Sequence, residues 1–245
     1  MLIVNCQLSI RQDLGANIFF DQNSIQLLNF VSEKSITEVF HSNYRMLDEI
    51  KNLFAHEAQS IMNIPVTDAF TGALDAIHQS VHQNGGKVVV SGMGKAGQIA
   101  ISIATTFSST GTPAVWLHPA DAQHGDLGIL CRNDILLLIS NSGKTREIIE
   151  LLTLAKGLWA QIPVIVITSN PESLLALKAD VCIYTGNPVE VCPLGLSPTT
   201  STTVMSAIGD ALVVQMMKRI NFDKSEYAKR HHGGYLGQKS RGETL

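Results

Sequence analysis

The spacing of apolar residues changes at about residue 85, and the two spacings predict different secondary structure. Between residues 35 and 84 apolar residues recur at intervals of three and four, which is the period of an amphipathic helix. Pro65 interrupts this stretch, and Asn84-Gly85-Gly86 ends it. We therefore expect two helices in this region, one on each side of Pro65.

Beyond residue 86, short apolar runs alternate with helical stretches. The runs have strand length and are Lys87–Ser91, Ala114–His118, Asp134–Ser140, Pro163–Thr168 and Val181–Thr185. Such alternation is typical of βαβ units, and four of the runs are apolar nearly throughout, as strands covered on both faces are. The pattern predicts an α/β protein, a three-layer α/β/α sandwich with a five-stranded parallel sheet.

The two ends of the chain are less regular. Residues 1–34 show weak periodicity and no motif, so they form either a helical N-terminal extension or a poorly ordered leader, and we expect one domain over residues 35–245. After the last strand, a long loop (Gly186–Pro198) leads into an apolar helix from about Thr199 to Ile220. A shorter polar helix is expected to end at His231-His232-Gly233-Gly234.

Composition narrows the class of protein. Hydrophobic residues make up 45% and charged residues 16% of the 245 residues, as in folded enzymes. A net charge of -3 gives no basic field for a nucleic-acid backbone. No apolar run approaches the roughly 20 residues of a membrane helix, the opening residues lack the features of a signal peptide, and the four cysteines form no Cys-x-x-Cys pair. We expect a cytoplasmic protein with buried thiols and no nucleic-acid or membrane partner.

Ligands bind beyond the carboxyl ends of the strands in an open parallel sheet, and the first such loop is rich in glycine. Ser91–Gly97 reads Ser-Gly-Met-Gly-Lys-Ala-Gly and matches Gly-x-Gly-x-x-Gly between a strand and a helix. It is not a nucleotide P-loop, because Val89 occupies the first glycine position and Ala96 replaces the Ser or Thr that binds magnesium. A dinucleotide site stays open, although the next strand ends in Trp116-Leu117-His118 without a carboxylate for a ribose.

A second loop, Ser140-Asn141-Ser142-Gly143-Lys144-Thr145, precedes a helix that begins near Arg146. Hydroxyl and backbone N–H groups at a helix N-terminus favour a phosphate monoester. An N-cap needs only one Ser or Thr, whereas this loop has three around a glycine. We predict that Ser140, Asn141, Ser142 and Thr145 bind phosphate.

Longer motifs carry a resemblance to a known family. They are Gly92–Lys95, Ser108–Pro113, His118–Gly128, Ser142-Gly143, Cys192–Leu196, Pro198–Thr203 and Gly209–Leu212. Over about residues 40–238 the chain resembles the sugar isomerase (SIS) family, whose fold is flavodoxin-like and doubly wound, and within it the arabinose-5-phosphate isomerases of Kdo and lipopolysaccharide synthesis. The paired CBS modules that commonly follow this domain are not expected, because the sequence stops at Leu245.

The resemblance implies an aldose-ketose isomerase that interconverts D-ribulose 5-phosphate and D-arabinose 5-phosphate through an enediolate, without metal or cofactor. It implies five polar residues near the sugar: Lys95, His124, Glu147, Glu190 and His231. We expect Glu190, or alternatively Glu147, to be the proton-transferring base and Lys95 to stabilise oxygen charge. His124 and His231 are expected to serve ring opening or hydroxyl proton transfer. Further substrate contacts are expected at Gly92, Gly94, Thr199 and Thr200.

Other functions stay open on the sequence. Glu147 in a first helical turn also suits the helix dipole alone, and Lys95 also suits a solvated surface position. Rival functions are a regulator that binds a sugar phosphate without converting it, an isomerase of the same family acting on a hexulose or heptose phosphate, and a nicotinamide oxidoreductase that uses Gly92, Gly94 and Gly97.

Two expectations concern partners. The SIS family usually forms tetramers, and the helix from Thr199 to Ile220 carries seven large apolar residues, more than one sheet face readily covers. We therefore expect a homotetramer, in which His231 reaches a neighbouring subunit's site. A nucleotide-activated Kdo is the expected feedback inhibitor, bound at the sugar-phosphate pocket.

Overall fold

The structure, a computed structural model, describes the backbone of residues 33–242 and the side chains of residues 44–242. The chain divides into two compact units, Met1–Leu53 and Phe54–Leu245. Helix α3 (Glu33–Met62) begins in the first unit, which confirms the helix predicted before Pro65. Our expectation for residues 1–34 falls almost wholly outside the described residues.

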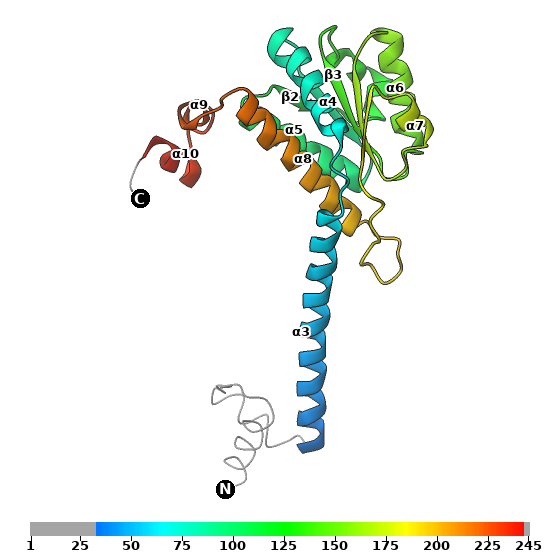
Figure 1. Cartoon of the computed structure of the whole chain (residues 1–245), viewed down its shortest axis with the longest axis vertical. Helices are drawn as coiled ribbons and strands as arrows, with labels where there is room; N and C mark the ends of the chain where they lie inside the picture. The colour runs from blue at the N-terminus through cyan, green and yellow to red at the C-terminus, as the bar shows by residue number, and fades with distance from the viewer. Residues whose placement is uncertain (1–32, 243–245) are drawn as a thin grey trace. The chain divides into compact units, whose positions relative to one another are not determined.

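The second unit is built on a five-stranded parallel sheet, as predicted (Figure 1). Its strands are β1 (Val88–Gly92), β2 (Ala114–Trp116), β3 (Ile135–Ile139), β4 (Val164–Thr168) and β5 (Val181–Tyr184). The order across the sheet is β2-β1-β3-β4-β5, which is the doubly wound, flavodoxin-like order. Each strand lies within or close to a run predicted from the sequence.

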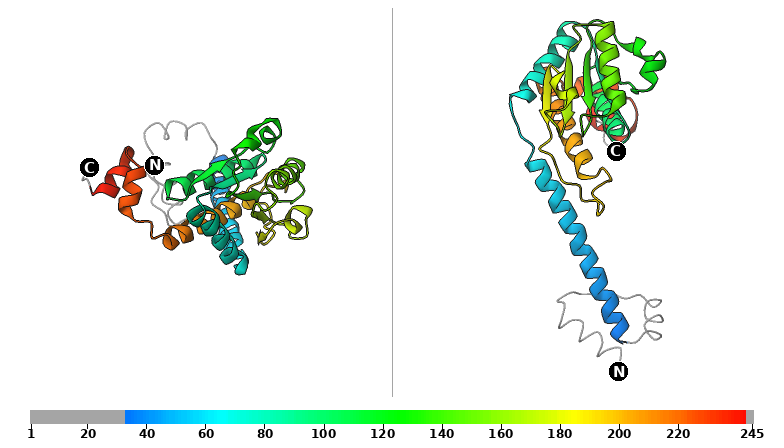
Figure 2. Two further views of the ribbon diagram at one scale, coloured as in Figure 1. Left: turned by 90° about the horizontal axis from the view of Figure 1, so that it is seen from above. Right: turned by 90° about the vertical axis from the view of Figure 1, so that its right-hand side faces the viewer.

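The core has two halves, one on each face of the sheet, and helices cover both faces (Figure 2). Val88 and Val90 of β1 belong to one half and Val89 to the other, because successive strand side chains point to opposite faces. The three central strands are buried along their whole length, whereas the edge strands β2 and β5 are only partly buried. This burial accounts for the continuous apolar runs of the central strands.

Helices supply the outer layers. Residues of α4 (Asp68–Ile77), α5 (Lys95–Ser109) and α8 (Thr200–Arg219) pack against one face, and residues of α6 (Arg146–Leu158) and α7 (Leu174–Leu177) against the other. The remaining elements are a π-helical continuation of α4 (His78–Gln83), 3-10 helices η2 (Asp121–His124) and η3 (Asp126–Ile129), α9 (Lys224–Arg230) and α10 (Gly234–Arg241). The sequence predicted α8 and α9, and it missed α7 and α10, which are short. No helix within residues 33–242 is long and apolar enough to cross a membrane.

One argument from the sequence is wrong. Helix α8 was expected to expose more apolar surface than the sheet covers, but most of its apolar side chains are buried within this chain, and Val214 is its exposed large apolar residue. They are buried because α8 packs closely on α5: a Cβ atom on Gly209 would lie 2.4 Å from Ile103. In the second unit, exposed large apolar residues include Phe54, Met62, Tyr235 and Leu236.

Candidate active site

The two loops singled out in the sequence are neighbours at the carboxyl edge of the sheet. Gly92, the last residue of β1, pairs with Ile139, the last residue of β3. The loops that begin after these residues therefore start side by side. The strand order reverses between β1 and β3, and such a switch point is where ligands bind in doubly wound sheets.

The glycines of the first loop have backbone reasons to be glycine. A Cβ atom on Gly92 would lie 2.6 Å from the carbonyl oxygen of Ala96, and one on Gly97 would lie 2.9 Å from the carbonyl oxygen of Gly92. Gly94 has φ +60° and is the residue before α5. The motif thus lets α5 start close against β1 and places Lys95, whose side chain is exposed, at the first position of the helix.

The hydroxyls of the second loop are not used to cap α6. Thr145 is the residue before the helix, yet its side chain makes no capping hydrogen bond. Its Oγ1 instead lies 2.9 Å from Oγ of the buried Ser140, while Oγ of Ser142 accepts a hydrogen bond from the backbone N of Lys144 (3.2 Å). The first N–H groups of an uncapped helix are donors without an intrahelical partner, so this loop suits an anion.

The second loop is held in place by the segment after β4. The carbonyl oxygen of Asn141 accepts hydrogen bonds from the backbone N of Ser169 (3.0 Å) and from its Oγ (2.7 Å). Asn170 Nδ2 donates to the carbonyl oxygen of Ser142 (3.2 Å). Gly143 has φ +63°, and a Cβ atom there would lie 2.1 Å from Oγ of Ser173. Sequence reasoning did not find these anchors, because they join segments that are far apart along the chain.

Glu190 lies at the N-terminus of α8. Its Oε2 accepts hydrogen bonds from the backbone N of Thr199 (2.8 Å), from Oγ1 of Thr199 (2.9 Å) and from the backbone N of Ser201 (3.2 Å). Burial raises the pKa of this carboxyl, but hydrogen bonds from Ser201 and Thr199 outweigh burial and lower the pKa overall. Thr200 is fully buried, and its Oγ1 accepts a hydrogen bond from the backbone N of Val191. Glu190 is thus a carboxylate held ionised at neutral pH.

Glu147 and His124 come from segments that pack together. Glu147 is in the first turn of α6 and is half-buried. His124, which is exposed, ends η2, and the adjacent Gln123 donates a hydrogen bond to Glu150 of α6 (2.9 Å). A hollow of about 480 Å³ opens beside this segment, with Trp116 among its lining residues. Both side chains therefore lie near the carboxyl edge of the sheet.

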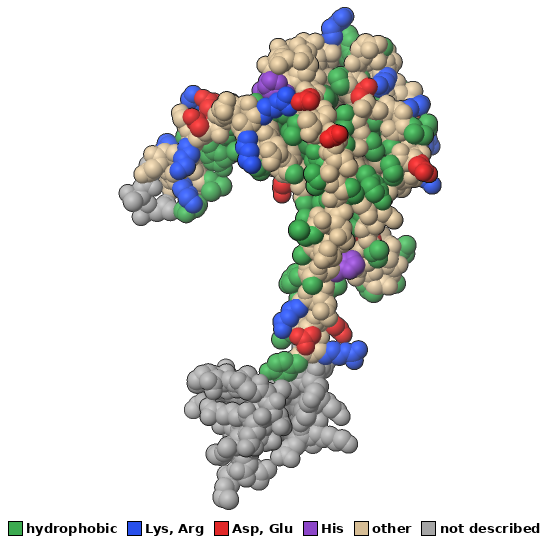
Figure 3. Space-filling view, in the orientation of Figure 1, with side chains coloured by type: hydrophobic (Ala, Val, Ile, Leu, Met, Phe, Trp, Pro, Cys, Tyr) green, Lys and Arg blue, Asp and Glu red, His purple; other side chains and the backbone are tan. Residues whose placement is uncertain are grey.

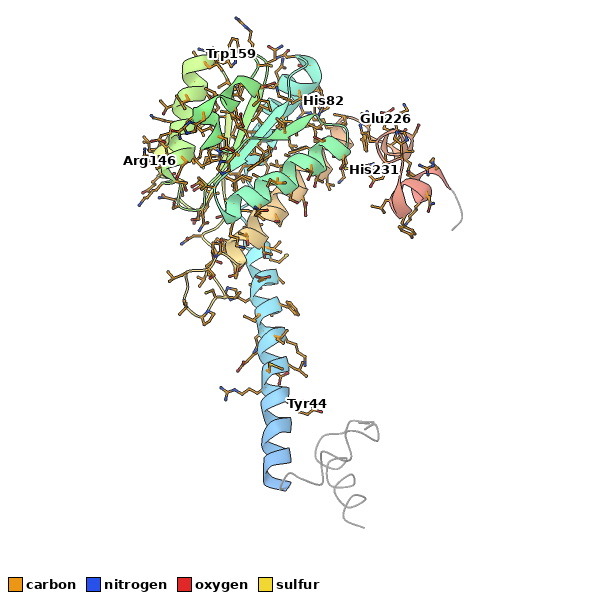
Figure 4. The ribbon with its side chains drawn as sticks, turned by 180° about the vertical axis from the view of Figure 1, so that it is seen from behind. Tyr44, His82, Arg146, Trp159, Glu226 and His231 are labelled. Atoms are coloured by element: carbon orange, nitrogen blue, oxygen red, sulfur yellow. The ribbon has the colours of Figure 1, made fainter. Side chains whose placement is uncertain are left out.

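His231 does not join the other candidates in its own chain. It follows α9, and Figure 4 shows it well separated from Arg146, the first residue of α6. Its ring stacks on Tyr227 instead. The structure thus brings together Ser140 with Thr145 and Glu190 with Thr199.

Cys192, two residues after Glu190, has a thiol pKa below the ordinary value, which the sequence did not predict. Backbone N–H groups of Ser197, Leu196 and Leu194, in that order, lower the pKa of the Cys192 thiol to about 7. The expectation of buried thiols is wrong for Cys131, which is exposed because it lies in the turn before β3. Within the described part of the chain, no group of three or more His, Cys, Asp or Glu side chains is placed to hold a metal ion.

The chain belongs to the SIS family, because residues 82–215 match the family model for the SIS domain. A curated relative is 47% identical over 174 residues, which are 71% of this chain and 51% of the relative, and it is named arabinose 5-phosphate isomerase KdsD, from Yersinia pestis. The chain therefore spans about half the length of that relative.

Solved structures agree with this fold. A protein from Bacteroides fragilis NCTC 9343, described as a phosphosugar isomerase involved in capsule formation, is 63% identical with a TM-score of 0.77, over 78% of this chain and 99% of that one. A protein from Escherichia coli CFT073 in complex with arabinose 5-phosphate is 32% identical with a TM-score of 0.72, over 77% of this chain and 98% of that one.

Proposed function

We propose that the chain is an aldose-ketose isomerase that interconverts D-ribulose 5-phosphate and D-arabinose 5-phosphate through an enediolate. The observation that carries the proposal is the Ser140–Thr145 loop, which leaves the start of α6 uncapped and lies beside the Gly92–Lys95 loop at the switch point of the sheet. The sugar is suggested by the relative named arabinose 5-phosphate isomerase and by the neighbour in complex with arabinose 5-phosphate.

The phosphate is bound by Ser140, Asn141, Ser142 and Thr145 together with N–H groups of α6. This contact anchors the substrate and is the same in the ground state and the transition state. The reacting carbons C1 and C2 then lie beyond the phosphate, where proton transfer takes place.

Glu190 is the base that moves the proton between C1 and C2. Its Oε2 is held by three hydrogen bonds, so the carboxylate is fixed in position and ionised at neutral pH. Glu147 is the alternative base. Lys95 stabilises the negative charge of the enediolate oxygens, and His124 and His231 serve ring opening and hydroxyl proton transfer. Further contacts come from the following residues: Gly92, Gly94, Thr199 and Thr200.

The assembly that we propose is a homotetramer in which His231 enters a neighbouring subunit's site. Its support is the separation of His231 from α6 within one chain, together with exposed apolar residues such as Phe54, Met62, Tyr235 and Leu236. Hydrophobic side chains are visible on the C-terminal helices in Figure 3. Light scattering that finds a fully active monomer would exclude this arrangement.

We place the reaction in the cytoplasm, in Kdo and lipopolysaccharide synthesis. A nucleotide-activated Kdo is the proposed feedback inhibitor, since its phosphate and hydroxyl groups suit the Ser140–Thr145 loop. Inhibition by CMP-Kdo should be competitive with ribulose 5-phosphate. Absence of inhibition at millimolar concentration would end this part of the proposal.

A panel of phosphorylated aldoses and ketoses, assayed with a chelator present, tests the proposed function. Conversion should be greatest with ribulose 5-phosphate and arabinose 5-phosphate. Conversion of a hexulose phosphate instead would change the substrate. Tight binding of a sugar phosphate without any conversion would indicate a regulator.

A further inference from the structure

The neighbours of His231 determine which of its ring nitrogens carries the proton. Nδ1 of His231 lies 3.0 Å from the carbonyl oxygen of Tyr227, four residues earlier. A carbonyl oxygen only accepts hydrogen bonds, so Nδ1 is the protonated nitrogen of the neutral ring and Nε2 keeps its lone pair. The backbone N of His231 donates to the same carbonyl oxygen (3.1 Å). Both the backbone and the ring of His231 are therefore tied to Tyr227.

The plane of the His231 ring is fixed by stacking. The imidazole lies on the Tyr227 phenol ring with the centroids 3.7 Å apart and the planes 4° apart. The Tyr227 ring in turn packs edge-on against the Phe222 ring, with the two centroids 6.5 Å apart. A Cβ atom on Gly111 would lie 2.7 Å from the Phe222 ring, so Phe222 packs on the turn after α5. A row of aromatic contacts thus connects His231, through Tyr227 and Phe222, to the turn after α5.

Helix α10 holds His231 from the other side. A Cβ atom on Gly237 would lie 2.2 Å from the carbonyl oxygen of His231, so α10 touches this backbone where glycine alone fits. Arg241 Nη1 also donates to that carbonyl oxygen (3.3 Å). The pair of helices α9 and α10 therefore holds His231 with little freedom to turn.

We infer that Tyr227 is the positioning residue for His231: its carbonyl oxygen sets the tautomer, its ring sets the plane of the imidazole, and together they present Nε2 to the substrate. The inference rests on the proposed function, because it concerns how His231 handles a substrate proton. Tyr227 itself does not touch substrate. A neutral imidazole with an unprotonated Nε2 is the form that accepts a proton from a sugar hydroxyl.

Two variants of the full-length protein separate the ring from its hydroxyl. Tyr227→Phe keeps the stacked ring, and among the described residues the Tyr227 hydroxyl makes no hydrogen bond, so this variant is the matched control. Tyr227→Leu keeps the carbonyl oxygen and an apolar side chain but removes the stacked ring. NMR of histidine labelled with nitrogen-15 reports the tautomer without any need for activity. Wild-type protein and Tyr227→Phe should show His231 protonated on Nδ1. Tyr227→Leu should show a mixture of tautomers, because an imidazole that is no longer stacked can turn away from the carbonyl oxygen.

Kinetics tests the consequence. Tyr227→Leu should lower kcat roughly tenfold with KM nearly unchanged, since misplacing a reacting group by about 1 Å is costly, and Tyr227→Phe should keep kcat. In a His231→Gln background, Tyr227→Leu should have no further effect on kcat, because the two residues act as one unit. An additive loss in that double variant would mean that Tyr227 acts only on stability.

If Tyr227→Leu fails to fold, NMR of the wild-type protein still tests the hydrogen bond from His231 Nδ1 to the Tyr227 carbonyl oxygen. Wild-type His231 protonated on Nε2 at neutral pH would overturn the inference directly. A protein without isomerase activity would end the proposed function, and the tautomers of the wild-type protein and the two variants would still decide whether Tyr227 positions the ring.

Discussion

Replacing Glu190 with Gln separates the hydrogen bonds that Glu190 makes at the start of α8 from the catalytic role that we propose for it. Glu190 stabilises the start of α8, and we propose that it is also the base. Gln has nearly the same shape and its amide oxygen can still accept the bonds from Thr199 and Ser201. The variant therefore removes the charge and the basicity and keeps the packing.

The expected loss of stability is modest. Hydrogen bonds to a charged acceptor are stronger than those to a neutral one, and a carboxylate at a helix N-terminus contributes about 0.3–1 kcal/mol. We expect the free energy of unfolding to fall by about 1–2 kcal/mol at neutral pH. Because the folded-state pKa of Glu190 is lowered, this contribution is present above the unfolded pKa of about 4.3 and is lost as pH falls through the folded value.

The expected loss of activity is much larger. Removing a general base costs a factor of about 10² or more in kcat, which is about 2.7 kcal/mol in the barrier. Urea unfolding followed by circular dichroism measures the first effect, and initial rates with saturating ribulose 5-phosphate measure the second. Thr67→Ala is a matched control, because Thr67 is the N-cap of α4 and its loss should cost about 1 kcal/mol while kcat stays at the wild-type value.

The reasoning is refuted if Glu190→Gln keeps the wild-type kcat while losing stability, since Glu190 would then only cap α8. The role of base would pass to Glu147, and Glu147→Gln would have to lose kcat by the same factor. If both variants keep full activity, proton transfer by either carboxylate is excluded.

Further predictions follow from the same geometry. Ser142→Ala and Thr145→Val should raise KM with kcat little changed, because phosphate binding is equal in ground and transition states; a selective loss of kcat would contradict this. Alkylation of Cys192 by iodoacetamide should rise with pH around a midpoint of about 7, since the thiolate reacts; a midpoint above 8 in a Cys192-only variant would be inconsistent with the N–H contacts. Burial, then His78, lowers the pKa of His82, so stability should fall as pH drops below about 6.5, and His82→Gln should reduce that fall in urea titrations.

The sequence predicted the central sheet well because its strands depend on local patterns. Val88–Gly92 and Ile135–Ile139 are buried on both faces, so their apolar runs are continuous and easy to recognise. The exposed apolar face expected of α8 was wrong, because the pattern of one helix does not reveal that α5 approaches it closely at Gly209.

The candidate site shows the same limit. Hydroxyl clustering in Ser140–Thr145 was visible in the sequence, but the anchor from Asn170 was not, since it comes from a different strand end. The hydrogen bonds from Thr199 and Ser201 to Glu190 join residues nine or more apart, and the sequence did not predict them either. Contacts of this kind arise from tertiary packing, so local sequence patterns do not predict them.

Isomerisation in deuterium oxide tests the central claim most directly. The purified chain, incubated with D-ribulose 5-phosphate and a metal chelator, should form D-arabinose 5-phosphate. In proton NMR the C2 proton signal of the product should be reduced, because deuterium from the solvent enters at C2 through the enediolate. Glu190→Gln should form it at least about 10²-fold more slowly. Ribulose 5-phosphate that stays unchanged, or is bound without conversion, would contradict the account.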